Sequence, residues 1–175
     1  MLIKILMSKK ERETMIIKNV RIEERLIHGQ VATVWLSHLS PDRIIIIDNE
    51  TSTSDLQKKM LRIACPREIK LSIFSVARAL EKLAEKPYEG EKVFILFKDP
   101  ENLKEFIDGG FNLISVNVGN MAGKQGAKQI KKAVSVTENQ YKIFMELAGK
   151  GLDFTAKMVP NDPDVNFLEL LKSNF

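Results

Sequence analysis

The sequence predicts an α/β fold, a three-layer α/β/α arrangement around a mainly parallel central sheet. Short β-branched or apolar segments alternate with helical patterns along almost the whole chain. Repeated strand–helix units of this spacing place successive strands parallel, with helices on both faces. The runs RIIIID and VFILF are continuously apolar, which is typical of strands buried on both sides. The pattern also allows one antiparallel strand at an edge of the sheet.

The first predicted elements frame a stretch of unusual composition. IIKNVR, residues 16–21, is short, apolar and partly β-branched, and predicts the first strand. A helix is predicted soon after it, because four side chains recur at i, i+3, i+4 and i+7 and would share one face. They are Val31, Val34, Trp35 and His38. We expect His38 to pack near the end of this helix.

The remaining elements alternate in the same way. Further strands are predicted at 43–48, 69–74, 93–97, 112–118 and 130–136. Helices are predicted at 55–64 and 76–86, from 100 to the Gly109-Gly110 pair, and up to 147. Their expected caps are Ser54 (with Gln57), Ser75, Asp99 and Thr137 (with Gln140). The segment LDFTAKMV and the amphipathic NFLELLK complete the chain.

Length and composition favour a single globular domain. The chain has 175 residues, of which 44% are hydrophobic and 29% charged, enough for one real core. No linker, repeat or low-complexity segment divides it. We therefore predict one domain at 15–175. Residues 1–14 are predicted to be an N-terminal extension outside the fold, disordered or resulting from an upstream start codon.

Charge and cysteine content exclude several classes of protein. The excess of 27 Lys and Arg over 23 Asp and Glu is a mild +4. The densest basic region contains no aromatic residue for bases to stack on, so nucleic-acid binding is not predicted. Its residues are Lys124, Lys128, Lys131 and Lys132. The single cysteine, Cys65, is expected to be a buried small hydrophobe in a reducing compartment. No apolar run has the length of a membrane span, and the cytoplasm is the expected location.

His28 is the strongest candidate functional residue. In RIEERLIHGQ it follows four charged side chains and precedes the predicted helix. Loops at the carboxyl ends of parallel strands carry the functional site in such folds, and a helix N-terminus there favours an anion. Arg21 and Arg25 could hold a phosphate through paired hydrogen bonds, while nearby positive charge keeps an imidazole neutral and nucleophilic. This pattern suits a histidine that accepts a phosphoryl group, but a helix cap or surface histidine fits it about as well.

The stretch RIEERLIHGQVATVW resembles the signature RIDxRLIHGQV of the mannose/fructose/sorbose family of enzyme IIB components. These are subunits of the bacterial sugar phosphotransferase system. The likeness runs from Met15 to the C-terminus and includes IIIIDNETSTSDLQKKMLRIACP, SVNVGNMAGKQGAKQIKKAVSVTEN and DFTAKMVPNDP. Glu23 departs from the aspartate of the signature, so the resemblance assigns that residue no firm role.

The resemblance implies an activity and partners. His28 would be phosphorylated on Nδ1 by a phosphohistidine of a IIA protein or domain. It would then pass the group to a sugar bound in the membrane IIC/IID complex, which makes the chain a protein-Nπ-phosphohistidine–sugar phosphotransferase (EC 2.7.1 class). Arg21 and Arg25 match the arginines of the signature, and Gly29 and Gln30 its glycine and glutamine. No cofactor and no metal are implied, and the protein would be cytoplasmic and peripherally associated with the transporter.

Three other residues are weaker candidates at the same rim. Asp48 ends the second predicted strand and could orient His28 or an arginine, or simply cap the turn at Asn49. Gly119 and Asn120 are expected in a flexible loop that touches the phosphate or a partner, or is an ordinary connection. The sequence leaves open which sugar is used and whether the chain self-associates. The rival functions are a regulatory phosphoacceptor and a module that binds a phosphate-bearing ligand without sugar phosphotransfer.

Overall fold

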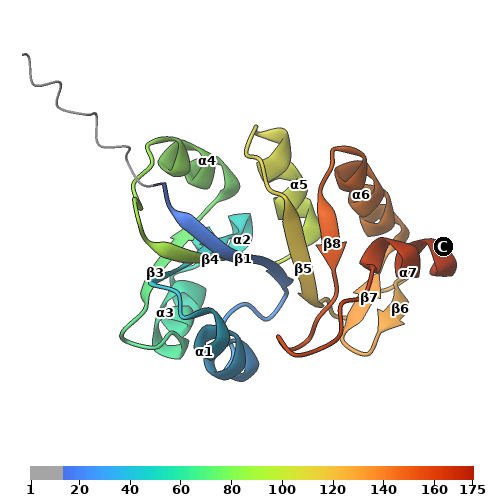
Figure 1. Ribbon diagram of the computed structural model, residues 1–175, viewed down its shortest axis with the longest axis horizontal. Coiled ribbons are helices and arrows are strands. Elements are labelled where there is room, and N and C mark those ends of the chain that lie inside the picture. The colour runs from blue at the N-terminus through green and yellow to red at the C-terminus, as the bar shows by residue number, and fades with distance from the viewer. Residues whose placement is uncertain (1–13) are drawn as a thin grey trace, which may run out of the picture.

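The computed structural model describes residues 14–175 (Figure 1). The predicted extension lies outside these residues, apart from Thr14, so its disorder stays a prediction. A six-stranded sheet with the order β3-β2-β4-β1-β5-β8 forms the centre of the molecule, and all its pairings are parallel. Its strands are β1 (Ile16–Glu23), β2 (Arg43–Ile47), β3 (Lys70–Phe74), β4 (Lys92–Phe97), β5 (Ser115–Asn120) and β8 (Asp153–Thr155).

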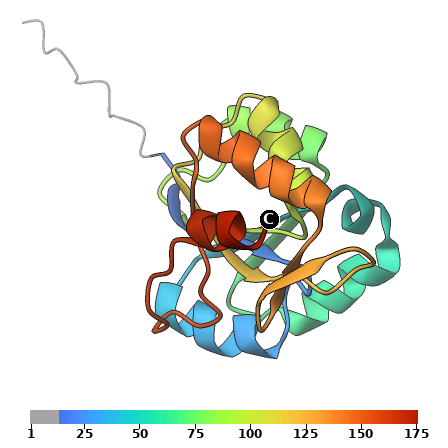
Figure 2. The ribbon, with the colours of Figure 1, turned by 90° about the vertical axis from the view of Figure 1, so that its right-hand side faces the viewer.

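Helices cover both faces of this sheet, which confirms the predicted three layers (Figure 2). The helical segments are η1 (Val31–Trp35), α1 (Leu36–Leu39), α2 (Asn49–Thr53), α3 (Asp55–Ala64), α4 (Val76–Ala84), α5 (Pro100–Asp108), α6 (Glu138–Gly149) and α7 (Phe167–Asn174). Strand β2 shows why both faces need a cover, since successive side chains point to opposite sides. Ile44 and Ile46 pack with η1, α1 and α3, whereas Ile45 and Ile47 pack with α4, α5 and α6.

Most helix starts follow the predicted caps. The side chains of Ser54, Ser75 and Asp99 each accept a hydrogen bond from the backbone N–H three residues on. Thr137 and Gln140 form the complete reciprocal box at the start of α6. Each cap satisfies one of the N–H groups that a helix start leaves without a partner.

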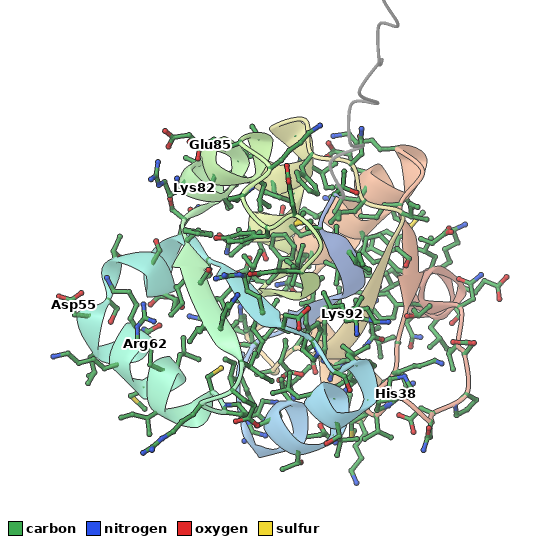
Figure 3. All side chains as sticks on the ribbon, turned by 60° about the vertical axis from the view of Figure 1, so that its left-hand side comes forward. His38, Asp55, Arg62, Lys82, Glu85 and Lys92 are labelled. Atoms are coloured by element: carbon green, nitrogen blue, oxygen red, sulfur yellow. The ribbon has the colours of Figure 1, made fainter. Side chains whose placement is uncertain are left out.

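The helix after β1 differs from its prediction. Its first part, η1, is a π-helical segment, in which hydrogen bonds join i to i+5 and each turn takes in more residues. The buried face therefore consists of Val31, Trp35, Leu36 and Leu39. Val34 and His38, predicted on that face, are exposed. His38 is labelled on this helix in Figure 3, and its ring is nearly perpendicular to the Trp35 ring, with the ring centres 6.5 Å apart.

Two further predictions about the strands are wrong, and the antiparallel pairing that the sequence allowed lies outside the main sheet. The edge strand β8 is parallel, and the antiparallel strands instead form a separate pair, β6 (Lys128–Lys131) and β7 (Val134–Val136). That hairpin replaces the single strand predicted at 130–136, because the chain turns at 132–133 without a glycine or proline to signal it. Gly119 and Asn120 belong to β5 rather than to a flexible loop, since the strand stays paired with β1 up to Asn120.

Candidate active site

The C-terminal end of β1 supplies the buried charges of the site. The strand lies between β4 and β5, and it continues to Glu23, two residues beyond its predicted end. Ile22 points into the core, and Arg21 and Glu23 are fully buried as well. Residues two apart in a strand share a face, which brings the guanidinium of Arg21 against the carboxylate of Glu23.

The guanidinium of Arg21 is engaged on every side by protein groups. Its Nε and Nη2 donate to Glu23 Oε2 over 3.0 and 2.8 Å. Nη1 donates to the carbonyl of Lys157 over 2.7 Å, and Nη2 also reaches the carbonyl of Met158. The group lies 4.7 Å from the centre of the Trp35 ring, whose Nε1 donates to the same Met158 carbonyl. Arg21 therefore joins β1, η1 and the loop at 157–162, which follows β8 and is called the C-terminal loop below.

Gly119 leaves the space that the guanidinium fills. A Cβ atom at this position would overlap the Cζ, Nη2 and Nε atoms of Arg21, closer than the 3.0 Å that real Cβ atoms respect. The structure relates Gly119 to the site through Arg21, because this position leaves room for the guanidinium. Position 119 requires glycine because the guanidinium of Arg21 lies so close to the backbone there, and not because of the backbone conformation.

A tight turn after β1 carries the chain back to Glu23. The N–H of Leu26 donates to the carbonyl of Glu23 over 2.9 Å, and Leu26 adopts a left-handed φ of 53°. Such a conformation strains a residue with a side chain, and here it turns Leu26 and Ile27 into the core. Glu24 fastens the turn to β5, because its N–H donates to the carbonyl of Asn120.

His28 follows directly and faces Glu23. Its Nε2 lies 3.3 Å from Glu23 Oε1, although the two atoms do not meet in hydrogen-bond geometry. Both atoms are buried and have no other partner among the described residues. Only 12% of the His28 side chain is exposed. A carboxylate beside one ring nitrogen favours the tautomer that carries the proton there, which leaves Nδ1 with its lone pair.

The surroundings favour the neutral imidazole. Burial lowers the pKa of His28 below its ordinary value of 6.5, and the positive charges of Arg25 and Arg21 lower it further, whereas Glu23 opposes them. Burial also lowers the pKa of Arg21, against the stabilising charge of Glu23. An uncharged imidazole with an available nitrogen is a competent nucleophile towards phosphorus.

Arg25 is the exposed cation of the site. It stands at the turn between Glu23 and His28, and forms no ion pair within residues 14–175. Together with Asn120 and Lys132 it lines an open hollow of about 630 Å³ between this turn and the β6–β7 hairpin. Its guanidinium is therefore free to meet a ligand or a partner, which the guanidinium of Arg21 is not.

The other predicted residues are only partly gathered around His28. Gly29 and Gln30 continue directly from it into the helix, and the carbonyl of His28 accepts from the N–H of Ala32. Asn120 binds the turn through its backbone carbonyl. Asp48 is not brought to the site: β4 separates its strand from β1, and its carboxylate caps α2 and accepts from Asn102.

Two contributors were missed or undervalued from the sequence. Glu23 had been given no firm role, yet it is the group that faces His28. A carboxylate two residues from an arginine near a strand end was the available signal. The loop at 157–162 supplies the carbonyl acceptors of Arg21. This segment was part of the family resemblance, but its residue types gave no sign of that role, because every residue has a backbone carbonyl.

The described residues contain no cluster of three His, Cys, Asp or Glu side chains that could hold a metal ion. Across residues 14–175 no helix combines the length and apolar character that crossing a membrane requires.

Comparison with known proteins identifies the family. The family model described as the PTS system sorbose subfamily IIB component matches residues 17–175. The chain belongs to this family. IIB components of the phosphotransferase system accept a phosphoryl group from IIA and pass it to the sugar, and the chain is a phosphotransferase subunit of this kind.

Individual relatives agree over nearly the whole domain. The sorbose-specific EIIB component of Lacticaseibacillus casei is 38% identical over 161 residues, which cover 92% of this chain and 98% of that protein. The mannose-specific EIIAB component of Escherichia coli K12 is 34% identical over 90% of this chain, which spans 49% of that longer protein. The solved IIBSor domain of the sorbose permease from Klebsiella pneumoniae has a TM-score of 0.86 at 33% identity, with 91% and 98% of the two chains covered.

Proposed function

We propose that His28 is the phosphorylated residue of this IIB component and that Nδ1 is the acceptor atom. One observation carries the proposal: Nε2 faces the buried carboxylate of Glu23 at 3.3 Å, so the proton belongs there and Nδ1 is the nucleophile. In the first step a P–N bond forms to Nδ1 as the P–N bond to the IIA histidine breaks. In the second step the P–Nδ1 bond breaks as a sugar hydroxyl oxygen takes the phosphoryl group. The hydroxyl proton leaves to solvent, and His28 is neutral again with its proton on Nε2.

The two arginines have different roles in this scheme. Arg25, exposed beside His28, contacts the phosphoryl oxygens while the group moves, because a guanidinium can hold two of them at once. The backbone N–H groups at the start of the helix, around Gly29 and Gln30, add a preference for negative charge. Arg21 is a positioning residue, since its own hydrogen bonds are committed to Glu23 and the C-terminal loop.

The activity proposed is that of a protein-Nπ-phosphohistidine–sugar phosphotransferase. IIB components work with IIA and with membrane IIC and IID components, and we propose that the chain meets its own IIC/IID complex as a cytoplasmic, peripherally bound subunit. The relation to sorbose-, mannose- and fructose-specific proteins supports a hexose as substrate without selecting one. Transfer to sugar is favoured over a purely regulatory phosphoacceptor or a phosphate-binding module, because the named relatives are transport components.

Phosphorylation of the purified protein tests the assignment. The chain is incubated with labelled phosphoenolpyruvate, the general phosphotransferase proteins and a cognate IIA, and the label is mapped by mass spectrometry. We expect an acid-labile, base-stable phosphate on His28. His28→Ala should abolish the label with an unchanged circular-dichroism spectrum, and His38→Ala, the matched control on the exposed helix surface, should keep it.

Two results would refute the proposal. The first is labelling of His28→Ala at the rate of the parent. The second is stoichiometric phospho-IIA that leaves the parent unlabelled. Reconstitution with the membrane complex then separates transport from regulation, because only a transport component produces sugar phosphate.

A further inference from the structure

The outer surface of α3 carries a stripe of apolar side chains that nothing in the described chain covers. Leu56 is 69% exposed, Met60 60% and Ile63 85%. Their spacing of four and three residues places them on one face of the helix. The opposite face is the one that holds α3 to the domain, since Leu61 packs into the core. Three large aliphatic side chains side by side in water are unusual for a surface that has no partner.

Positive charge accompanies this stripe. Lys59 and Arg62 are exposed on one flank of it, and Arg67 is exposed just beyond the end of the helix. None of the three forms an ion pair within residues 14–175, although Lys58 pairs with Asp55. The labels of Asp55 and Arg62 in Figure 3 mark the course of the helix along the outside of the domain. Its unpaired cations would repel a second copy of the same face and attract an anionic surface.

We propose that the α3 stripe binds the anionic lipid surface of the membrane. Leu, Met and Ile on one face with Lys and Arg beside them are the composition of helices that lie in the headgroup region. The stripe contains no aromatic side chain, so it lacks the aromatic anchors that are common in protein interfaces. It is also a convex ridge on a helix, which a deformable lipid surface accommodates without a matching groove.

This contact would keep the carrier beside its acceptor. Helix α3 and the loop that carries His28 lie on the same side of the sheet, because Leu26 and Ile27 share a core cluster with Leu61 of α3. A domain bound through α3 would thus present that side, and not its opposite, towards the membrane. The advantage of being held near the acceptor rests on the proposed function, whereas the binding of the stripe to lipid does not.

Vesicle flotation with the purified full chain tests the inference. The probes are vesicles of equal parts phosphatidylglycerol and phosphatidylcholine, and vesicles of phosphatidylcholine alone. We expect flotation with the anionic vesicles, weakened by salt at about 0.5 M because screening reduces attraction to the surface. Leu56→Gln/Ile63→Gln and Lys59→Glu/Arg62→Glu should each lower the partition coefficient about tenfold or more. Ile114→Gln is the matched control, because Ile114 is 83% exposed but lies outside the stripe, and it should bind like the parent.

Each alternative outcome is distinct. No flotation of the parent, or equal flotation of the parent and both double variants, overturns the inference. If the double variants bind vesicles like the parent but transfer phosphate slowly to the membrane complex in detergent, the stripe is a protein interface instead. His28→Ala should float like the parent, so a failure of the phosphohistidine assignment would leave the lipid contact intact. The stripe variants should still be labelled by phospho-IIA like the parent, so a failure of the lipid contact would leave the phosphohistidine assignment intact.

Discussion

Gly119→Ala is the substitution that tests most directly how the buried charges support His28. The added Cβ would overlap the guanidinium of Arg21, at a distance below 3.0 Å. Arg21 is fully buried and cannot swing into solvent. It would have to move against Trp35 and loosen its hydrogen bonds to Glu23, so a substitution of one methyl group should disturb the whole support of the site.

The expected loss of stability follows from two opposing effects. Forcing a methyl group into a filled site costs on the order of 1–3 kcal/mol, and weakening a buried ion pair adds to this, up to about 3–5 kcal/mol if one partner were lost. The alanine restricts the unfolded chain and returns about 0.4–1 kcal/mol. We therefore expect the free energy of unfolding to fall by about 2–4 kcal/mol.

Urea denaturation followed by circular dichroism measures this change. With an m-value of about 2 kcal/mol per molar, the midpoint should fall by about 1–2 M. The labelling of His28 by phospho-IIA should slow in the folded fraction, because Glu23 is no longer held in place. Gly123→Ala is the control, since its Cβ would lie 3.7 Å from Ser135 Oγ, an ordinary contact. A Gly119→Ala protein with the midpoint and labelling rate of the parent would show that Arg21 does not depend on this space.

Three further predictions concern the rate and its pH dependence. Arg25→Ala should slow transfer to sugar about a hundredfold, with Arg25→Lys recovering part of it in quench-flow; equal rates would remove Arg25 from the catalytic groups. The rate of His28 labelling should fall only below pH 6.5, because burial above all lowers the pKa of His28. Glu23→Gln should move this fall to still lower pH, since the charge of Glu23 raises that pKa. A shift of the fall to higher pH in this variant would contradict the assigned role of Glu23. Because the pKa of His28 is lower in the folded chain, the unfolded chain binds more protons, so the free energy of unfolding should fall as pH drops through 6.5. Denaturation at pH 5 and pH 7 should show a smaller difference between the two free energies in His28→Ala than in the parent.

The sequence predicted the layers because its strongest signals are buried strands and helix caps. A continuous apolar run indicates a strand buried on both faces, and Ile44 to Ile47 do alternate between two core clusters. The caps Ser75 and Asp99 act as predicted. The π-helical turn was not predictable in this way. The i, i+3, i+4 rule assumes the α-helical period, and a locally wider turn moves Val34 and His38 to the surface while the sequence pattern stays the same.

The sequence predicted the positions of His28 and Arg25 in the fold, and the surroundings of the other candidate residues less well. His28 and Arg25 lie in a loop at the carboxyl end of a central strand, where the fold class places functional residues. Arg21 was expected to grip phosphate alongside Arg25, but its burial depends on the length of β1 and on loop carbonyls from the other end of the chain. Asp48 stood at a comparable strand end, and only the strand order, with β4 in between, shows that it belongs elsewhere.

On the proposed assignment, the buried pair of Arg21 and Glu23 would influence how firmly His28 holds a phosphoryl group. Arg21 occupies one carboxylate oxygen of Glu23 and leaves Oε1 buried without a hydrogen bond. Attack on phosphorus through Nδ1 leaves the proton on Nε2, so the phosphorylated ring carries a positive charge and its Nε2–H faces the unsatisfied oxygen. The positive charge on that ring strengthens its attraction to the carboxylate of Glu23 relative to the neutral ring. Burial of His28 acts in the opposite direction, because it disfavours added charge. The balance of these two effects suits a histidine that must accept a phosphoryl group from one partner and release it to the next.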